Sequence, residues 1–181
     1  MGKSNWDEED FRACWYYSVN DGLGFVSIGW GEVGDLLRFN EDLKDLRSTV
    51  IEVAKRKKWP TRAGELEWKV PASITYDVTT LSNFAGWTNA KNPMEKGDGV
   101  IAYNEKCVYA IGEVKGDYVF QKDLPWFQHT REVQWFKYLK TPPRLTKNDS
   151  LIVRSLGRPP TLLPITKKAV VKAVWKLDQW N

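Results

Sequence analysis

Three groups of residues have the types and spacing that binding or catalysis requires. Residues 29–34, GWGEVG, fit the G-x-G-x-x-G pattern of a dinucleotide-binding turn, with Glu52 where a ribose-binding acid is expected. Asp98, followed by Glu113 and Lys115, has the D…E-x-K spacing of a Mg²⁺-dependent nuclease. Tryptophans in loops occur together with clusters of lysine and arginine. That combination is typical of nucleic-acid binding, because bases stack on aromatic rings while cations contact phosphates.

The surroundings of the GWGEVG segment argue against a dinucleotide site. Such a turn belongs to a parallel βαβ unit. After residue 97, however, the expected strands follow one another with short turns, which indicates antiparallel hairpins. Glu32 and Asp35 would also bring two carboxylates to the helix N-terminus that should receive a pyrophosphate. Asp35 is better explained as the cap of its own helix, and no cofactor is expected.

The nuclease interpretation stays open as an alternative. The simpler explanation is that residues 97–99, GDG, form a turn that enters a strand and that Glu113 and Lys115 face solvent. His129 is the only histidine and no serine lies in a G-x-S-x-G context, which argues against acyl transfer and excludes His-rich metal sites. Cys14 and Cys107 are far apart in apolar runs, which indicates buried thiols rather than a disulfide framework or a zinc site. No metal is expected.

Length and composition indicate one domain, residues 1–181, with a hydrophobic content of 42% that suffices for a core. No run approaches 18 apolar residues, and the polar, acidic N-terminus is neither a secretory nor a myristoylation signal. We therefore expect a cytoplasmic protein without membrane contact. The net charge is +4, and the basic residues form two groups. These are Lys55, Arg56, Lys57 and Lys58, and then Arg154, Arg158, Lys167, Lys168, Lys172 and Lys176.

The apolar periodicity predicts strands and helices in the first half of the chain. We expect strands over 14–19 and 25–28, a helix over 35–46, and a helix capped by Ser48 or Thr49 that ends before Trp59. A loop to residue 71 and a helix over 75–84 follow.

The second half of the chain is predicted to be mainly strand. The expected strands are 100–103, 108–114, 117–121, 132–139 and 151–155, with turns at 104–106 and 115–117. Breaks at three prolines precede a final helix capped by Thr166. This order predicts an α+β fold with a small curved sheet or barrel.

The order of five segments resembles the YTH and EVE domains of the PUA-like superfamily. The segments are CWYYSVN, GFVSIGW, GDGVIAYNEKCVYAIGEVKG, LPWFQHTREVQWFKYLKTPP and PITKKAVVKAVWKL. The similarity is strongest to the EVE/YTH-type domains at the N-terminus of archaeal McrB-like proteins of modification-dependent restriction systems. It covers residues 11–40 and 97–178 and leaves approximately 41–96 as a helical insertion.

The resemblance implies a small curved β-barrel-like sheet flanked by helices, with an aromatic cage for one methylated base extruded from its strand. Trp30 and Trp126 match the cage tryptophans, and Phe127 is the neighbour of the second. Ser18 and Asn20 match positions that contact the base edge, and Arg158 matches a phosphate-binding arginine. Further pocket candidates without a family counterpart are Tyr17, Asn83 and Trp87.

We therefore expect a non-enzymatic DNA-binding domain that recognises N6-methyladenine by base flipping. Lys55 to Lys58, Arg154, Lys167 and Lys168 would supply phosphate contacts. The resemblance implies an AAA+ GTPase region and a nuclease subunit as partners. Two alternatives stay open: an RNA-binding PUA-like module, and a Mg²⁺-dependent nuclease that uses Asp98, Glu113 and Lys115.

Overall fold

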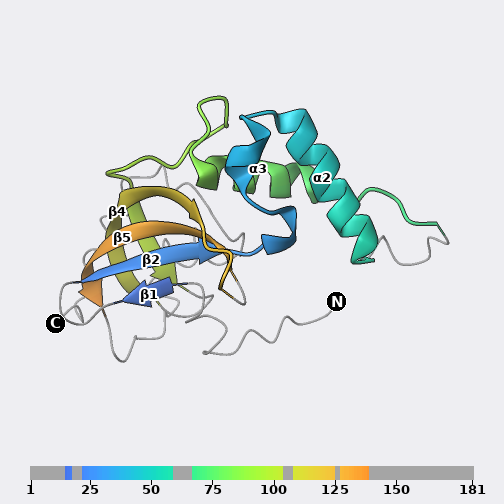
Figure 1. Cartoon of the computed structure of the whole chain (residues 1–181). Coiled ribbons are helices and arrows are strands. Elements are labelled where there is room, and N and C mark those ends of the chain that lie inside the picture. The colour runs from blue at the N-terminus through green and yellow to red at the C-terminus, as the bar shows by residue number, and fades with distance from the viewer. Residues whose placement is uncertain (1–14, 18–21, 59–66, 104–107, 125–126, 139–181) are drawn as a thin grey trace, which may run out of the picture.

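The computed structural model of the chain describes residues 15–17, 22–58, 67–103, 108–124 and 127–138 (Figure 1). The strands are β1 (Trp15–Tyr17), β2 (Leu23–Ile28), β3 (Gly99–Tyr103), β4 (Val108–Phe120) and β5 (His129–Tyr138). The helices are two 3₁₀ turns, η1 (Gly31–Val33) and η2 (Leu36–Phe39), and the α-helices α2 (Leu43–Arg56) and α3 (Ile74–Ala85). The α+β prediction is confirmed.

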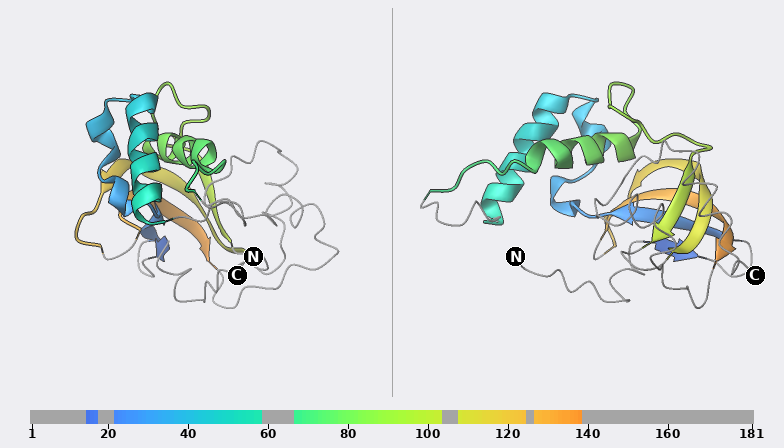
Figure 2. Two further views of the ribbon diagram at one scale, coloured as in Figure 1. Left: turned by 90° about the vertical axis from the view of Figure 1, so that its right-hand side faces the viewer. Right: turned by 180° about the vertical axis from the view of Figure 1, so that it is seen from behind.

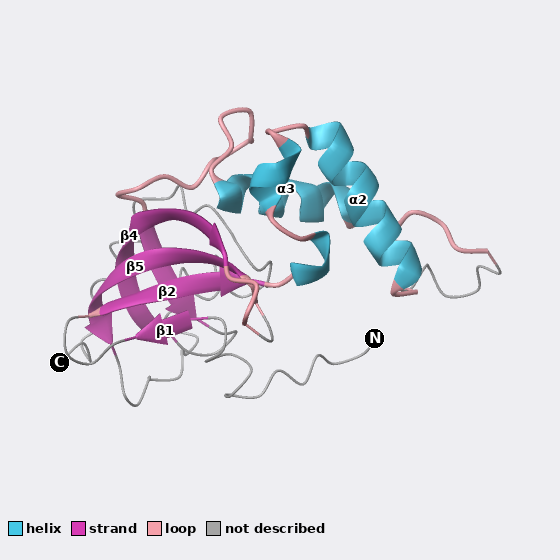
Figure 3. Ribbon diagram, in the orientation of Figure 1, coloured by secondary structure: helices cyan, strands magenta, loops and turns pink. Residues whose placement is uncertain are grey.

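The strands form one curved antiparallel sheet in the order β1-β2-β5-β4-β3 (Figures 1 and 3). β2 therefore pairs with β5, although most of the described chain separates them in sequence. Every pairing among the described strands is antiparallel. This confirms the argument against a parallel, dinucleotide-binding sheet.

The two α-helices lie together on one side of the molecule and the sheet lies on the other (Figure 2). Both fall within the expected insertion at 41–96, and the predicted helix over 75–84 is confirmed as α3. None of the described helices has the length and apolar character that a membrane crossing demands.

The predicted boundary between the first two helices is wrong. Instead of one helix over 35–46 and a second from Ser48 or Thr49, the chain forms the short η2 and then the single helix α2. Asn40 and Glu41 have positive φ values of 47° and 63°, which no α-helix accommodates. Asp42 then caps α2, because its carboxylate accepts hydrogen bonds from the N–H groups of Lys44 and Asp45.

The predicted turn at 115–117 is also wrong, because β4 is one continuous strand. Val114 pairs with Val133 and Tyr118 pairs with Arg131, so four steps along β4 match two steps along β5. The surplus residues form a bulge. A Cβ on Gly116 would lie 2.7 Å from the Cβ of Glu132, so glycine permits this close approach of the two strands.

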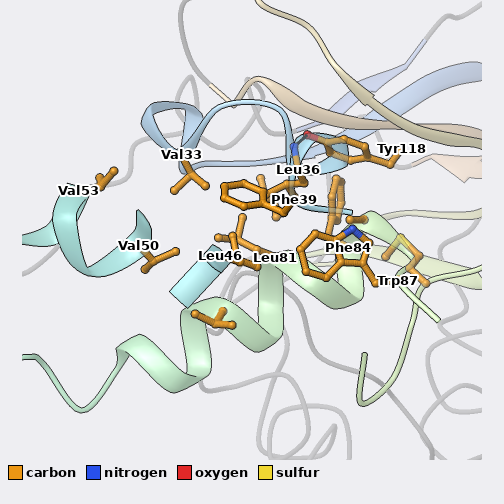
Figure 4. Close-up of a cluster of buried hydrophobic side chains, with 14 of the residues drawn as sticks. Val33, Leu36, Phe39, Leu46, Val50, Val53, Leu81, Phe84, Trp87 and Tyr118 are labelled. Carbon is orange, nitrogen blue, oxygen red and sulfur yellow. Dashed lines mark hydrogen bonds between the residues drawn. The ribbon is translucent and has the colours of Figure 1, made fainter. Parts of the chain in front are cut away.

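A large hydrophobic cluster joins the helices to the sheet (Figure 4). η2 contributes Leu36 and Phe39, and the sheet contributes Val114 and Tyr118, all nearly fully buried. The helices add Leu46, Val50, Val53, Ile74, Leu81 and Phe84. A smaller cluster around Trp135 includes Val133, Ala102 and Ala110. Trp135 is thus a core residue. Cys14, Cys107 and the C-terminal elements predicted at 151–155 and after Thr166 lie outside the described residues.

Candidate functional site

The strand register brings two of the predicted cage aromatics together. β2 and β5 pair in an antiparallel register that ends with Ile28 opposite His129. Trp30 follows Ile28 by two residues and Phe127 precedes His129 by two residues, so both lie just beyond this end of the ladder. The Phe127 ring is also near: a Cβ built on Gly29 would lie 4.0 Å from it. Two segments about 100 residues apart in sequence thus form one aromatic corner, which we define as Trp30 and Phe127.

Both residues of the aromatic corner have a left-handed backbone conformation. Trp30 has a φ of 78° and Phe127 a φ of 54°. Bulky residues avoid this region, and each instance costs on the order of 1–3 kcal/mol unless the surroundings enforce it. Such strained residues concentrate at binding and active sites. Trp30 is half-buried and packs against the large hydrophobic cluster.

A buried hydrogen-bond chain fixes the backbone of Trp30. Its carbonyl oxygen accepts from the Val33 N–H at 2.8 Å and from His129 Nε2 at 3.0 Å. Because Nε2 must therefore carry the proton, Nδ1 of His129 accepts from the Tyr118 hydroxyl at 2.8 Å. The Tyr118 oxygen in turn accepts from the Leu36 N–H at 3.1 Å. This chain ties β4 and β5 to the GWGEVG segment.

Burial keeps His129 neutral. The side chain is fully buried, and this desolvation lowers its pKa. Its ring stacks on Tyr118 at a centroid distance of 5.8 Å and tilts against Phe120 at 5.2 Å. With both ring nitrogens bonded, the only histidine of the chain has a structural role.

A cavity of about 450 Å³ lies where the helical segment meets the sheet. It is lined by Leu37, Asn40 and Glu41 from the η2–α2 connection, by Ala85, Gly86 and Trp87 after α3, and by Asp117, Tyr118 and Arg131 from the sheet. The predicted pocket residue Trp87 is therefore a lining residue, whereas Trp30 is not. Tyr118 connects the two places, because its ring lines the cavity and its hydroxyl bonds His129.

Asn83 stabilises the loop that follows Trp87 through two hydrogen bonds. Its side-chain oxygen accepts from the Asn92 N–H at 3.0 Å, and its carbonyl accepts from Met94 N–H at 2.8 Å. Asn83 is buried and does not line the cavity. It thus positions the segment that follows Trp87 instead of contacting a ligand there.

A protein family described as "Domain of unknown function (DUF8426)" matches residues 15–153, which is well over half of the chain. The chain belongs to the DUF8426 family. The match includes every described residue of the aromatic corner and of the cavity. No curated protein and no solved structure matches the chain.

The basic segment at the end of α2 is solvent-exposed in this DUF8426 domain, but one member is paired. Lys57 Nζ lies 2.7 Å from Glu32 Oε1. This hydrogen bond lowers the pKa of Glu32. α2 has 14 residues, so this end is roughly 20 Å from the helix N-terminus beside the cavity. Lys55, Arg56 and Lys58 are exposed at that far end.

The three residues of the nuclease motif each have a structural partner. The Asp98 carboxylate accepts from the Glu95 N–H at 2.8 Å, within its own turn. Glu113 and Lys115 form an ion pair with each other. Across the described ranges, no group of three or more histidine, cysteine, aspartate or glutamate residues is arranged to hold a metal.

Several predicted site residues cannot be placed relative to the aromatic corner or the cavity. Trp126, Ser18, Asn20, Arg154, Arg158, Lys167 and Lys168 lie outside the described residues, and Tyr17 belongs to β1 without a described side chain. Sequence reasoning missed Arg131 and Tyr118 as cavity residues. The alternation of β4 and β5 gave no signal for them, because the bulge at Gly116 resets the register just before Tyr118.

Proposed function

We propose that this DUF8426 domain is a non-enzymatic reader of a modified base in DNA, namely N6-methyladenine. The base would leave its strand and stack at the aromatic corner. One observation carries the proposal: Trp30 and Phe127 lie just beyond the same end of two paired strands, both in the disfavoured left-handed conformation. Strain at two aromatic residues at one end of a sheet, one of them fixed by a buried hydrogen-bond chain, is typical of a preorganised binding surface.

The energetics of base extrusion agree with an aromatic corner of this kind. Extruding a base costs a few kcal/mol. Stacking on an aromatic ring returns about 1–3 kcal/mol, and burial of the methyl group adds roughly 0.8 kcal/mol. The difference between a methylated and an unmodified base would thus depend on the fit of one methyl group beside the rings.

The resemblance of the sequence to EVE/YTH-type domains extends the proposal to the fold and to partners. We infer a PUA-like, EVE/YTH-related domain in which residues 41–96 are the insertion. The curved antiparallel sheet with helices on one side supports this inference. Partners of the kind found in modification-dependent restriction systems, an AAA+ GTPase region and a nuclease subunit, remain part of the proposal.

Binding to matched duplexes tests the proposal. The duplexes carry no modification, N6-methyladenine or 5-methylcytosine, and RNA of the same sequence is added as a fourth ligand, at fixed salt with Mg²⁺. We expect the wild-type chain to prefer the N6-methyladenine duplex. Trp30→Asn should abolish that preference, because asparagine tolerates a positive φ but offers no ring.

Phe136→Ala is the matched control, since Phe136 is an exposed aromatic residue on β5 away from the corner. Equal affinity for all duplexes, unchanged in Trp30→Asn, would overturn the proposal that the domain recognises a modified base. Preference for RNA would support the RNA-binding alternative through 2′-hydroxyl contacts. Cleavage products that disappear in Glu113→Ala would support the nuclease instead.

A further inference from the structure

The cavity between the helices and the sheet has the construction of a small-molecule site. Its volume of about 450 Å³ is within the range of such sites. The inner wall is formed by Trp87 and Tyr118, which are 2% and 5% exposed. The rim is formed by exposed residues, among them Leu37, Asn40 and Asp117. The cavity thus combines two largely buried aromatic residues with a polar rim.

The rim of the cavity is rigidly built. Asn40 and Glu41 are consecutive left-handed residues, and the carbonyl of Glu41 accepts from the Asn89 side-chain amide at 2.7 Å. The Glu41 carboxylate accepts from the Thr88 N–H at 3.1 Å. These bonds join the two loops that enclose the cavity. They also engage the carboxylate of Glu41, one of two carboxylates on the rim.

Arg131 is a buried cation whose nearby carboxylates, Asp117 and Asp98, act on it without forming an ion pair, so that burial still lowers the pKa of its guanidinium. Its side chain lines the cavity, the residue is 4% exposed, and Nη1 donates to the Met94 carbonyl. Nε is buried and has no hydrogen-bond partner. Within the described part of the chain, no carboxylate forms an ion pair with Arg131. The second rim carboxylate, Asp117, instead pairs with Lys96 at 2.7 Å.

The surroundings of Arg131 do not fully offset the free energy of burying its guanidinium. A buried guanidinium with an unsatisfied N–H costs several kcal/mol unless an anion or an acceptor compensates for it. Gly86 keeps room for the group, because a Cβ there would lie 3.0 Å from Arg131 Nη2. An anionic group could supply both an acceptor and a charge for this guanidinium, and the neighbouring aromatic residues favour a flat, apolar ring beside it.

We infer that the cavity binds a nucleoside monophosphate, with its phosphate on Arg131 and its base against Trp87 and Tyr118. The nucleotide is either free or part of a nucleic-acid strand, and both present the same chemistry. This site is separate from the aromatic corner, and the hydrogen bond between Tyr118 and His129 is one link between the two. It does not require a modified base.

Titration of the whole chain with deoxyadenosine monophosphate, deoxyadenosine and inorganic phosphate tests the inference. Calorimetry gives the affinities, and the Arg131 Nε–Hε resonance in a nitrogen-15 spectrum reports on the guanidinium. We expect the nucleotide to bind at least about tenfold more tightly than deoxyadenosine and to shift that resonance. Binding of deoxyadenosine with equal affinity, or no binding of the nucleotide, would overturn the inference.

Two variants of exposed residues test the site without altering the buried Arg131. Leu37 lines the cavity but is 58% exposed, so Leu37→Glu adds a negative charge at the mouth without disturbing the core. We expect about tenfold weaker nucleotide binding in Leu37→Glu and unchanged binding in Val70→Glu. Val70 is exposed as well but does not line the cavity. Equal affinities in the two variants would contradict the site.

Competition identifies the source of the nucleotide. An unmodified single-stranded oligonucleotide that displaces the mononucleotide indicates a strand-borne ligand, and failure to displace it indicates a free one. Because no modified base is present in these titrations, their failure leaves the reader proposal unaffected. Loss of the methyl preference in the duplex experiment likewise leaves this site unaffected.

Discussion

His129 shows how one residue couples the sheet to the proposed binding segment. Its imidazole lies fully buried between the Tyr118 hydroxyl and the Trp30 carbonyl. Both hydrogen bonds require the neutral ring with the proton on Nε2. The conformation of Trp30 therefore depends on the neutral form of a side chain that gains its proton near neutral pH only in the unfolded chain.

We predict that the chain loses stability on acidification below about pH 6.5. Burial lowers the pKa of His129 in the folded state, so the unfolded chain binds the proton first. The contribution of His129 is complete above the unfolded pKa, and it falls as the pH decreases toward the lower folded pKa. Urea unfolding at pH 7.5 and pH 5.5 measures the difference.

His129→Gln is the control for this pH dependence, because glutamine keeps a neutral donor and acceptor. It should lower the free energy of unfolding at pH 7.5 and flatten the change between the two pH values. Carboxylates contribute mainly at lower pH, except that burial raises the pKa of Asp77. An unchanged pH dependence in His129→Gln would contradict the role of His129.

At the scale of elements, α2 ends in a conformation that its sequence does not favour. Lys57 is the C-cap and Lys58, the next residue, has a φ of 51°. Helices commonly end with glycine at this position, because glycine has no Cβ to oppose the left-handed conformation. Lys58, the last of the four basic residues at 55–58, thus carries a charge at a position where glycine would give a more stable helix end.

Lys58→Gly should raise the free energy of unfolding by roughly 0.5–1 kcal/mol, because it removes the strain of the left-handed backbone. Lys55→Gly, inside the last turn of α2, should lower the free energy by about 1 kcal/mol. Chemical denaturation of both variants gives the comparison. If both variants lose stability equally, the left-handed conformation of Lys58 does not describe the folded chain.

At the scale of the whole molecule, a net charge of +4 favours binding of nucleic acid through phosphates. The exposed basic end of α2 lies roughly 20 Å from the cavity end of that helix. Duplex DNA has charges on both strands about every 1.7 Å along its axis. Lys57 at this end pairs with Glu32, two residues from Trp30, so a duplex bound at the aromatic corner would pass close to the basic end of α2.

The double variant Lys55→Gln/Lys58→Gln should reduce the slope of log affinity against log salt by up to about 1.8, or about 0.9 for each phosphate that is no longer neutralised. The double variant Lys96→Gln/Lys115→Gln removes the same charge from residues that pair with Asp117 and Glu113. We expect it to leave the slope nearly unchanged. Equal slopes for the two variants would show that net charge alone matters. Affinities measured at several salt concentrations provide both slopes.

Local patterns in the sequence determined much of this molecule. The sequence predicted a helix over 75–84 and a strand over 100–103, which are α3 and β3, and short turns between strands predicted antiparallel pairing. Asp35 was correctly predicted to cap its own helix, since its carboxylate accepts from the Leu37 N–H at 3.0 Å. These features depend on residues a few positions apart, whose interactions the sequence displays directly.

Only the tertiary structure decided which distant residues meet. The pairing of β2 with β5 brings Trp30 and Phe127 to the same end of the sheet, and the bulge at Gly116 brings Tyr118 and Arg131 to one cavity. The continuity of β4 through Gly116 depends on a close approach to Glu132 that no local pattern encodes. Strand order and register arise from packing across the whole chain. The sequence thus determined the elements and residue types, and the tertiary contacts determined the sites that they form.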